Sequence, residues 1–402
     1  MGGYSLLDGV RVVEVAQLAP SSVGGHLADL GADVIKIETP GRGEGVRYAG
    51  AQAVGGPDGP GFMHLRWNRG KRSVELDLRT AEGVEAFLRL AASADAVVEG
   101  TRHGYLDRLG LGWERLAGQR PSTVLCEVSG TGAEGPYRDL ATGGMWFDAY
   151  AGLRTVDTAR PSPPGVMGGS AETPQAMYAV GAYGAMAVLA AVLRARTTGV
   201  GARLQVSSAD VAIAWMPDRI DGALNAGRTH RRPGWTADGR LPDWPLLDAY
   251  ATKDGGAMVF GSHTPKFWRA FCDAVDRPDL LEVDLASVDE GSDARARHVW
   301  RELDAVFRTR TRAEWTALFL AHDIAGGPVN TVTELVDDPH FTARATTYDQ
   351  DGFRFAASPV RVVGEEFAPQ RAPEFGAHTD EVLGEIRASR PSITTTTRGT
   401  ET

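Results

Sequence analysis

Residues 10–37 read VRVVEVAQLAPSSVGGHLADLGADVIKI and contain three segments with different patterns. Residues 10–15 form a short β-branched run, which is typical of a strand, and residues 33–37 form a second one. Between them, residues 21–30 predict a helix that the glycine at position 31 ends. Strand, helix and strand in this order indicate a parallel βαβ unit, because parallel neighbours need a crossover connection.

The same alternation continues along the first half of the chain. Residues 80–93 predict an amphipathic helix, and residues 96–98 and 123–128 predict further strands. Strands separated by helices of this length favour a doubly wound, parallel α/β sheet. The Gly- and Pro-rich segments 40–61 and 160–169 are longer than simple connections, and loops of that length carry function or disorder.

The second half of the chain differs in composition and in the order of its predicted elements. Residues 223–239 are polar and rich in Arg and His, so we interpret them as a connection between domains. Beyond it, a strand at 257–260 and helices at 265–275, 294–307 and 311–322 predict a small α/β domain. Residues 389–402 are Ser/Thr-rich, and we expect a disordered tail there.

A long apolar segment tests whether the chain enters a membrane. Residues 173–193 contain no charged side chain, and this segment is long enough to span a bilayer. The segment is rich in Ala and Gly and ends on Arg194 and Arg196, which favours a buried central helix. Pro174 suits the first position of that helix, and Gly181 and Gly184 lie three apart, where another backbone can approach closely.

Composition excludes several classes of protein. The 402 residues carry a formal net charge of −10, which argues against a nucleic-acid or anionic-membrane partner. Two cysteines far apart give no disulfide framework, and the start of the sequence shows no signal peptide. We therefore expect a cytoplasmic protein.

Common catalytic and nucleotide-binding motifs are not found. No Gly-x-Gly-x-x-Gly follows the first strand, and no Walker loop, nucleophile elbow or metal-ligand spacing is present, so we expect no metal. Cations do follow the strands, and ligands of open parallel sheets bind at the carboxyl ends of strands. These cations suit either a polyphosphate or solvated loop surfaces, and they are Arg42, Arg47, Arg69, Lys71, Arg72, Arg102 and Arg108.

Several segments resemble one family in a single order along residues 5–387. They include LLDGVRVVEV at 6–15, LADLGADVIKIE at 27–38, NRGKRSVELDL at 68–78 and RLGLG at 108–112. GTGAEGP at 130–136, PKFW at 265–268, Pro328-Val329 and HTDEVL at 378–383 continue the series. Together they resemble the class III CoA-transferases, the family of formyl-CoA transferase, carnitine CoA-transferase and α-methylacyl-CoA racemase.

The resemblance implies a Rossmann-like large domain built from both chain ends, with a smaller α/β domain inserted and two subunits interlocked as a dimer. We expect residues 1–222 and 331–388 in the large domain and residues 223–330 in the small one. It also implies that CoA or acyl-CoA binds as a substrate, with a carboxylic acid as co-substrate and no covalently bound cofactor. The CoA-binding candidates carried over by position are Gln17, Arg47, Lys71, Arg72, Arg102 and Arg108.

The chain departs from the family pattern at the catalytic position. Family transferases attack the thioester with an aspartate at the start of the central helix, forming a mixed anhydride and then an enzyme–CoA thioester. Here PQAMYAVG at 174–181 places Met177 at that position, and a thioether has no oxygen that could attack.

Three explanations remain open for Met177. An insertion would make Glu172 the carboxylate, although Glu172 also suits a charge beside the positive end of a helix. The chain could instead be a silent subunit that pairs with a paralogue in a heterodimer, rather than a catalytic homodimer. A third explanation is changed acyl-CoA chemistry, or CoA binding alone, with Asp148, Glu172 or Tyr178 as the candidate residues.

Four tryptophans are candidates for an apolar pocket, although core and domain contacts are the commoner role of this residue. They are Trp146, Trp215, Trp235 and Trp244.

Overall fold

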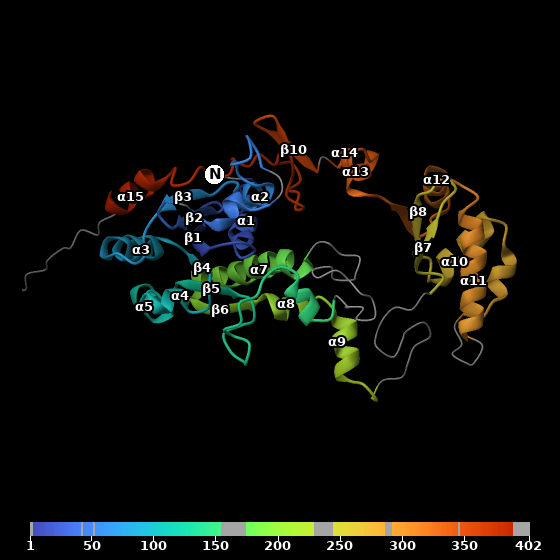
Figure 1. Ribbon diagram of the computed structural model, residues 1–402, viewed down its shortest axis with the longest axis horizontal. Coiled ribbons are helices and arrows are strands. Elements are labelled where there is room, and N and C mark those ends of the chain that lie inside the picture. Colours follow the sequence, from blue (N-terminus) through green and yellow to red (C-terminus); the bar gives the residue numbers. More distant parts are fainter. Residues whose placement is uncertain are drawn as a thin grey trace, which may run out of the picture. The chain divides into compact units, whose positions relative to one another are not determined.

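The computed structural model in Figure 1 describes residues 3–41, 43–50, 53–153, 174–228, 244–285, 292–344 and 346–388. The chain divides into a large compact unit, Met1–Trp215 with Ala345–Thr402, and a small one, Met216–Arg344. The expected fold class, a large α/β domain built from both chain ends with a smaller domain between them, is confirmed. The expected boundaries at residues 222 and 330 stay a prediction, since the compact units change at residues 215 and 344.

Six strands form one parallel sheet in the large unit, in the order β3-β2-β1-β4-β5-β6. Their bounds are β1 Arg11–Ala16, β2 Asp33–Glu38, β3 Arg72–Glu75, β4 Ala96–Gly100, β5 Val124–Ser129 and β6 Ala202–Ser207. The four inner strands are the ones that β-branched runs predicted. The edge strands β3 and β6 were not predicted, because an edge carries polar residues that weaken the apolar signal.

Helices cover both faces of this sheet. Alternate strand residues such as Val12 and Val13 point to opposite faces, so each face has its own core. One face packs against α1 (Ser21–Asp29) and α7 (Gln175–Thr198), and the other against α3 (Ala81–Ser93) and α15 (Thr379–Ala388). The remaining helices of the large unit are η1 Gly45–Tyr48, α2 Phe62–Asn68, α4 Tyr105–Arg108, α5 Trp113–Gln119, α6 Trp146–Tyr150 and α8 Ser208–Ala214.

The glycines of the central helix α7 permit its close contact with α1. A Cβ atom at Gly181 would lie 2.0 Å from Ser22 Oγ, and one at Gly184 would lie 2.5 Å from Val23 Cγ2. The predicted close approach is therefore confirmed. Among the described residues, α7 is the one helix long and apolar enough to cross a bilayer, and half of its most apolar window is buried inside the protein.

The C-terminal segment returns to the large unit. It forms the antiparallel hairpin of β10 (Thr347–Gln350) and β11 (Phe353–Ala356) and then α15. The backbone N–H of His378 donates to Ser73 O at 2.9 Å, which joins the start of α15 to the edge strand β3.

The small unit has an antiparallel sheet in the order β7-β8-β9. Its core is rich in aromatic rings, among them Tyr250, Phe260, Phe307 and Trp315. The predicted strand and three helices are present. The elements are α9 Pro217–Leu224, β7 Asp248–Ala251, β8 Ala257–Phe260, α10 Pro265–Ala274, η2 Pro278–Glu282, α11 Ser292–Phe307, α12 Arg312–His322, β9 Gly326–Val329, α13 Val332–Leu335 and α14 Pro339–Ala343.

Candidate functional site

The strand order places a switch point between β1 and β4, because the chain runs outward from β1 in one direction and from β4 in the other. Ligands of open α/β sheets bind at such a point, outside the carboxyl ends of the strands. Here the turn from β1 to α1 touches the end of β4. The backbone N–H of Gln17 donates to Gly100 O at 3.2 Å, and a Cβ atom at Gly100 would lie 2.1 Å from Pro20 Cβ.

The β1–α1 turn carries a strained and exposed residue. Leu18 has a φ of 56°, a left-handed conformation that costs a non-glycine residue about 1–2 kcal/mol. Gln17 and Leu18 both face solvent. Strain of this kind persists where the surroundings enforce it, and it is concentrated at binding sites.

Two buried lysines enforce the shape of this turn. Lys36 Nζ donates to Ala16 O at 2.7 Å and to Ser21 Oγ at 3.0 Å, and Lys71 Nζ donates to Ser21 O at 2.7 Å. Both lysines also bind the Glu14 carboxylate, Lys36 at 3.0 Å and Lys71 at 2.8 Å to each oxygen. The backbone that presents Gln17 is therefore held from inside the protein by ion pairs.

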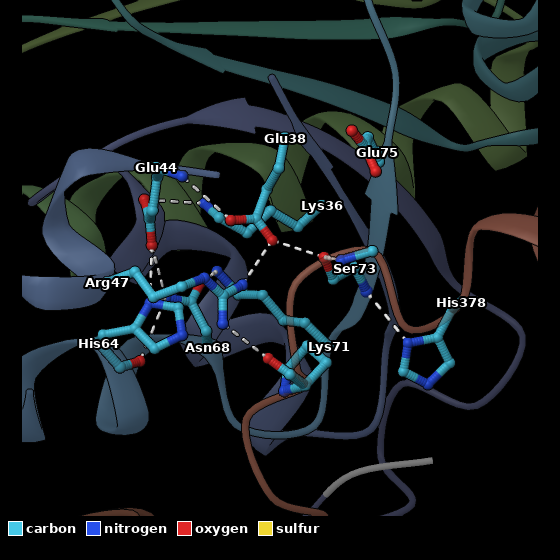
Figure 2. Close-up of polar contacts among 12 residues, drawn as sticks. Lys36, Glu38, Glu44, Arg47, His64, Asn68, Lys71, Ser73, Glu75 and His378 are labelled. Atoms are coloured by element: carbon cyan, nitrogen blue, oxygen red, sulfur yellow. Dashed lines mark hydrogen bonds and ion pairs between the residues drawn. The ribbon is translucent and has the colours of Figure 1, made fainter. Parts of the chain in front are cut away.

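The buried ion pairs extend to the loop after β2 (Figure 2). Glu44 lies 3.1 Å from Lys36 Nζ, and its other oxygen accepts from Asn68 Nδ2 at 2.8 Å and lies 3.0 Å from His64 Nδ1. Three carboxylates and three strong cations balance in this cluster: Glu14, Glu38 and Glu44 with Lys36, Arg47 and Lys71. A buried charge is tolerated only with such partners.

Burial and pairing act in opposite directions on these groups. Burial alone would lower the pKa of Lys36, but the Glu44 and Glu14 carboxylates outweigh it and raise that pKa. Burial would raise the pKa of Glu44, but Lys36 and His64 hold it well below its usual range. Burial lowers the pKa of Lys71 to about 8 and also lowers that of His64. The lysines stay charged at neutral pH, and His64 stays neutral.

Three of the six predicted CoA-binding residues have their charges engaged in ion pairs with other residues of the protein. The Lys71 side chain is 0% exposed, and Arg47 pairs with Glu38 at 2.6 Å and donates to Pro373 O at 2.9 Å. Arg72 begins β3, at the amino end of the sheet, and pairs there with Asp33, Glu381 and Glu385. In this structure none of the three presents its charge at the switch point.

The other three candidates come after the carboxyl ends of β1 and β4 along the chain. Gln17 follows β1, whereas Arg102 and Arg108 follow β4, and all three are exposed. The Arg108 guanidinium donates to His103 O at 2.8 Å across a turn in which Gly104 has a φ of +69°. An amide and two guanidinium groups therefore follow, along the chain, the two strands that flank the switch point.

A buried carboxylate anchors the loop that carries Arg102. Glu99, near the end of β4, accepts from the backbone N–H of Leu106 at 3.2 Å and thereby holds the start of α4. Burial, with a smaller contribution from Glu127, raises the pKa of Glu99 to about 7. Sequence reasoning missed Glu14, Lys36 and Glu99, although a charged residue inside a β-branched strand is a signal for a buried ion pair or cap.

The start of α7 is the position at which the family resemblance places the nucleophile. Asp148 is buried, and its two oxygens accept from the backbone N–H groups of Gln175 at 2.8 Å and Ala176 at 2.9 Å. Such bonds satisfy the free amides of a first turn and place negative charge at the positive end of the helix. Met177 comes next and packs, half-buried, against the core under α7. Glu172 and Trp235 lie outside the described residues.

A parallel sheet in this order, with exposed arginines after one of the two strands at its switch point, is typical of α/β proteins that bind phosphorylated ligands. Comparison with known proteins makes the class specific. The model of "CoA-transferase family III" matches residues 7–379, and this chain belongs to that family, as its motifs predicted.

Relatives with named activities match most of the chain. A "Probable fatty acyl-CoA transferase Rv3272" from Mycobacterium tuberculosis is 31% identical over 361 residues, which are 85% of this chain and 87% of the relative. A "Succinyl-CoA--D-citramalate CoA-transferase" from Chloroflexus aurantiacus is 32% identical, over 84% and 82% of the two chains. A crystal structure of Rv3272 has a TM-score of 0.78 at 29% identity, over 94% of this chain and 99% of that one.

Proposed function

We propose that this chain binds an acyl-CoA at the β1–β4 switch point and transfers CoA to a carboxylic acid. Its membership of CoA-transferase family III supports this reaction, and its relatives are named for several acyl groups, among them fatty acyl, succinyl and formyl. The observation that carries the proposal is the exposed set of Gln17, Arg102 and Arg108 beside the switch point. A guanidinium group binds phosphate oxygens in a bidentate manner, so we assign the two arginines to the phosphates of CoA.

The binding step is tested by removing one guanidinium group. Arg102→Ala is expected to weaken the binding of free CoA about tenfold, because one charge-assisted phosphate contact contributes on the order of 1.4 kcal/mol. Isothermal titration at two salt concentrations measures this and should also show a smaller salt dependence. Arg115→Ala, which removes an exposed arginine of α5, is the matched control and should leave the affinity unchanged. Equal affinity of Arg102→Ala and the wild type would contradict the assignment.

The transfer step needs an oxygen nucleophile. In the proposed step a carboxylate oxygen attacks the thioester carbonyl, the C–S bond breaks, and CoA leaves as the thiolate. CoA then attacks the enzyme's carboxyl carbon in the resulting mixed anhydride and releases the donor acid. We propose Glu172 as this carboxylate and Asp148 as a positioning residue, because both oxygens of Asp148 already accept bonds from the first turn of α7.

One observation favours a second candidate function. Met177 occupies the first turn of α7 and packs against the core. If Glu172 were not the nucleophile, the site would bind CoA without covalent chemistry. The chain would then be the silent partner of an active paralogue. Two relatives from Chloroflexus aurantiacus are named as the alpha subunit of a succinyl-CoA–L-malate CoA-transferase. A cytoplasmic location stays a prediction.

A surface of α7 supports the expected dimer. Met186 and Leu193 are 61% and 68% exposed, and with Tyr178, Ala182 and Ala190 they form an uncharged stripe along one side of the helix. Large exposed apolar surfaces mark interaction sites. We propose a second copy of this chain as the occupant, because a symmetric dimer brings the same patch of each subunit together.

A charge placed in this stripe tests the dimer. Met186→Glu is expected to convert the dimer to a monomer at micromolar concentration, because pairing the stripes would bury the two carboxylates without partners. Sedimentation velocity measures the change. Leu6→Glu, an exposed site on the same unit, is the control and should stay dimeric. A wild type that sediments as a monomer would contradict the proposal.

A further inference from the structure

Three aromatic side chains gather in the segment that precedes α7. The rings of Trp146 and Tyr150 are stacked, with centroids 4.9 Å apart and planes 13° apart, and Tyr137 meets Tyr150 edge-on at 6.2 Å. Tyr137 and Tyr150 are each 50% exposed. Leu140 and Met145, close by in the sequence, are also exposed. This is a preformed apolar surface and not a piece of the buried core.

The aromatic group is fixed in position by its own segment. Thr131 Oγ1 donates to Tyr137 O at 2.8 Å, so the loop after β5 folds back on itself. Trp146 packs against a small buried cluster that contains Phe147, Ala209 and Ala176, and Ala176 belongs to the first turn of α7. A rigid surface costs little conformational entropy when a ligand binds.

The same short helix also anchors the reactive end of the site. Asp148 lies between Trp146 and Tyr150 in α6, and it holds the backbone amides of Gln175 and Ala176. The ring stack is therefore attached to the first turn of α7, which carries position 177. The guanidinium groups assigned to the phosphates of CoA follow β4 instead, one strand away from β5.

We propose that Tyr137, Trp146 and Tyr150 form a platform for the acyl group, so that the preferred thioesters carry an aromatic or other large apolar acyl group. This inference rests on the proposed function, because it assigns the acyl end of the same acyl-CoA. Aromatic rings bind such groups by stacking and edge contacts.

The test compares ligands that differ only in the acyl group. Isothermal titration of the full chain with CoA, acetyl-CoA and phenylacetyl-CoA should give about tenfold tighter binding of phenylacetyl-CoA than of acetyl-CoA. Tyr150→Ala should weaken the binding of phenylacetyl-CoA at least about fivefold. The same variant should bind free CoA with an affinity within about twofold of the wild type. Tyr150→Phe, which keeps the ring, should retain the wild-type preference. Phe353→Ala, which removes another exposed ring of the large unit, is the control.

Two outcomes would overturn the platform while the proposed function survives. The first is wild-type protein that binds CoA but does not distinguish acetyl-CoA from phenylacetyl-CoA. The second is a Tyr150→Ala protein whose affinity for free CoA falls as much as its affinity for phenylacetyl-CoA. That result would mean that the ring contacts the adenine. A wild type that binds no CoA at all would instead overturn the proposed function, and the platform with it.

Discussion

Incubation of the wild-type chain with an acyl-CoA is expected to give a covalent adduct that hydroxylamine removes, and Glu172→Gln is expected to abolish it. An anhydride or thioester on a carboxylate reacts with hydroxylamine, whereas the amide of glutamine cannot attack the thioester. The loss should reach at least about 100-fold in the rate of adduct formation, because the nucleophile itself is removed. Intact-protein mass spectrometry over a panel of acyl-CoAs measures it.

A second variant separates a misplaced nucleophile from a missing one. Met177→Asp in the Glu172→Gln background places a carboxylate in the first turn of α7, where the helix end favours the ionised form, and it should restore an adduct. Met177→Ala in the same Glu172→Gln background is the matched control and should form no adduct. An adduct in Met177→Asp but none in the wild type, although acyl-CoA binds to both, would contradict transfer by this chain alone and identify it as a silent CoA-binding member.

Lys71→Met is expected to lower the free energy of unfolding by about 3–5 kcal/mol, because it removes one partner of a buried ion pair. Glu14 would keep only Lys36, and the carbonyl of Ser21 would lose its bond from Lys71. Urea denaturation with an unchanged slope measures the loss. The predicted role of Lys71 as a CoA ligand gives a different expectation, namely normal stability with weakened CoA binding.

An exposed ion pair and a double variant complete this test. Arg79→Met breaks a surface pair with Asp77 and should cost less than about 1 kcal/mol. Glu14→Gln combined with Lys71→Met should be more stable than the sum of the single losses predicts, because neither partner is left charged and alone. A stable Lys71→Met protein that no longer binds CoA would overturn the structural role that we assign to this lysine.

The fold was largely predictable because its signals are local. The β-branched runs of β1, β2, β4 and β5 and the glycine that ends α1 each specify their own element. Gly181 and Gly184 predicted a close helix contact from spacing alone, and the contact with α1 is present. The edge strand β3 was missed because its sequence, RSVE, is short and half polar, so its pairing with β2 decides its conformation.

The sequence by itself determined the family and the parallel sheet. Only the tertiary structure decided which cations face a ligand. Lys71 and Arg102 both follow a predicted loop or strand. Lys71 is nevertheless buried against Glu14, which is 57 residues away along the chain, whereas Arg102 is exposed. Asp148 likewise caps amides 27 and 28 residues further along the chain. The physical reason is that the free energy of a charge depends on burial and on partners brought close by folding, and local sequence encodes neither.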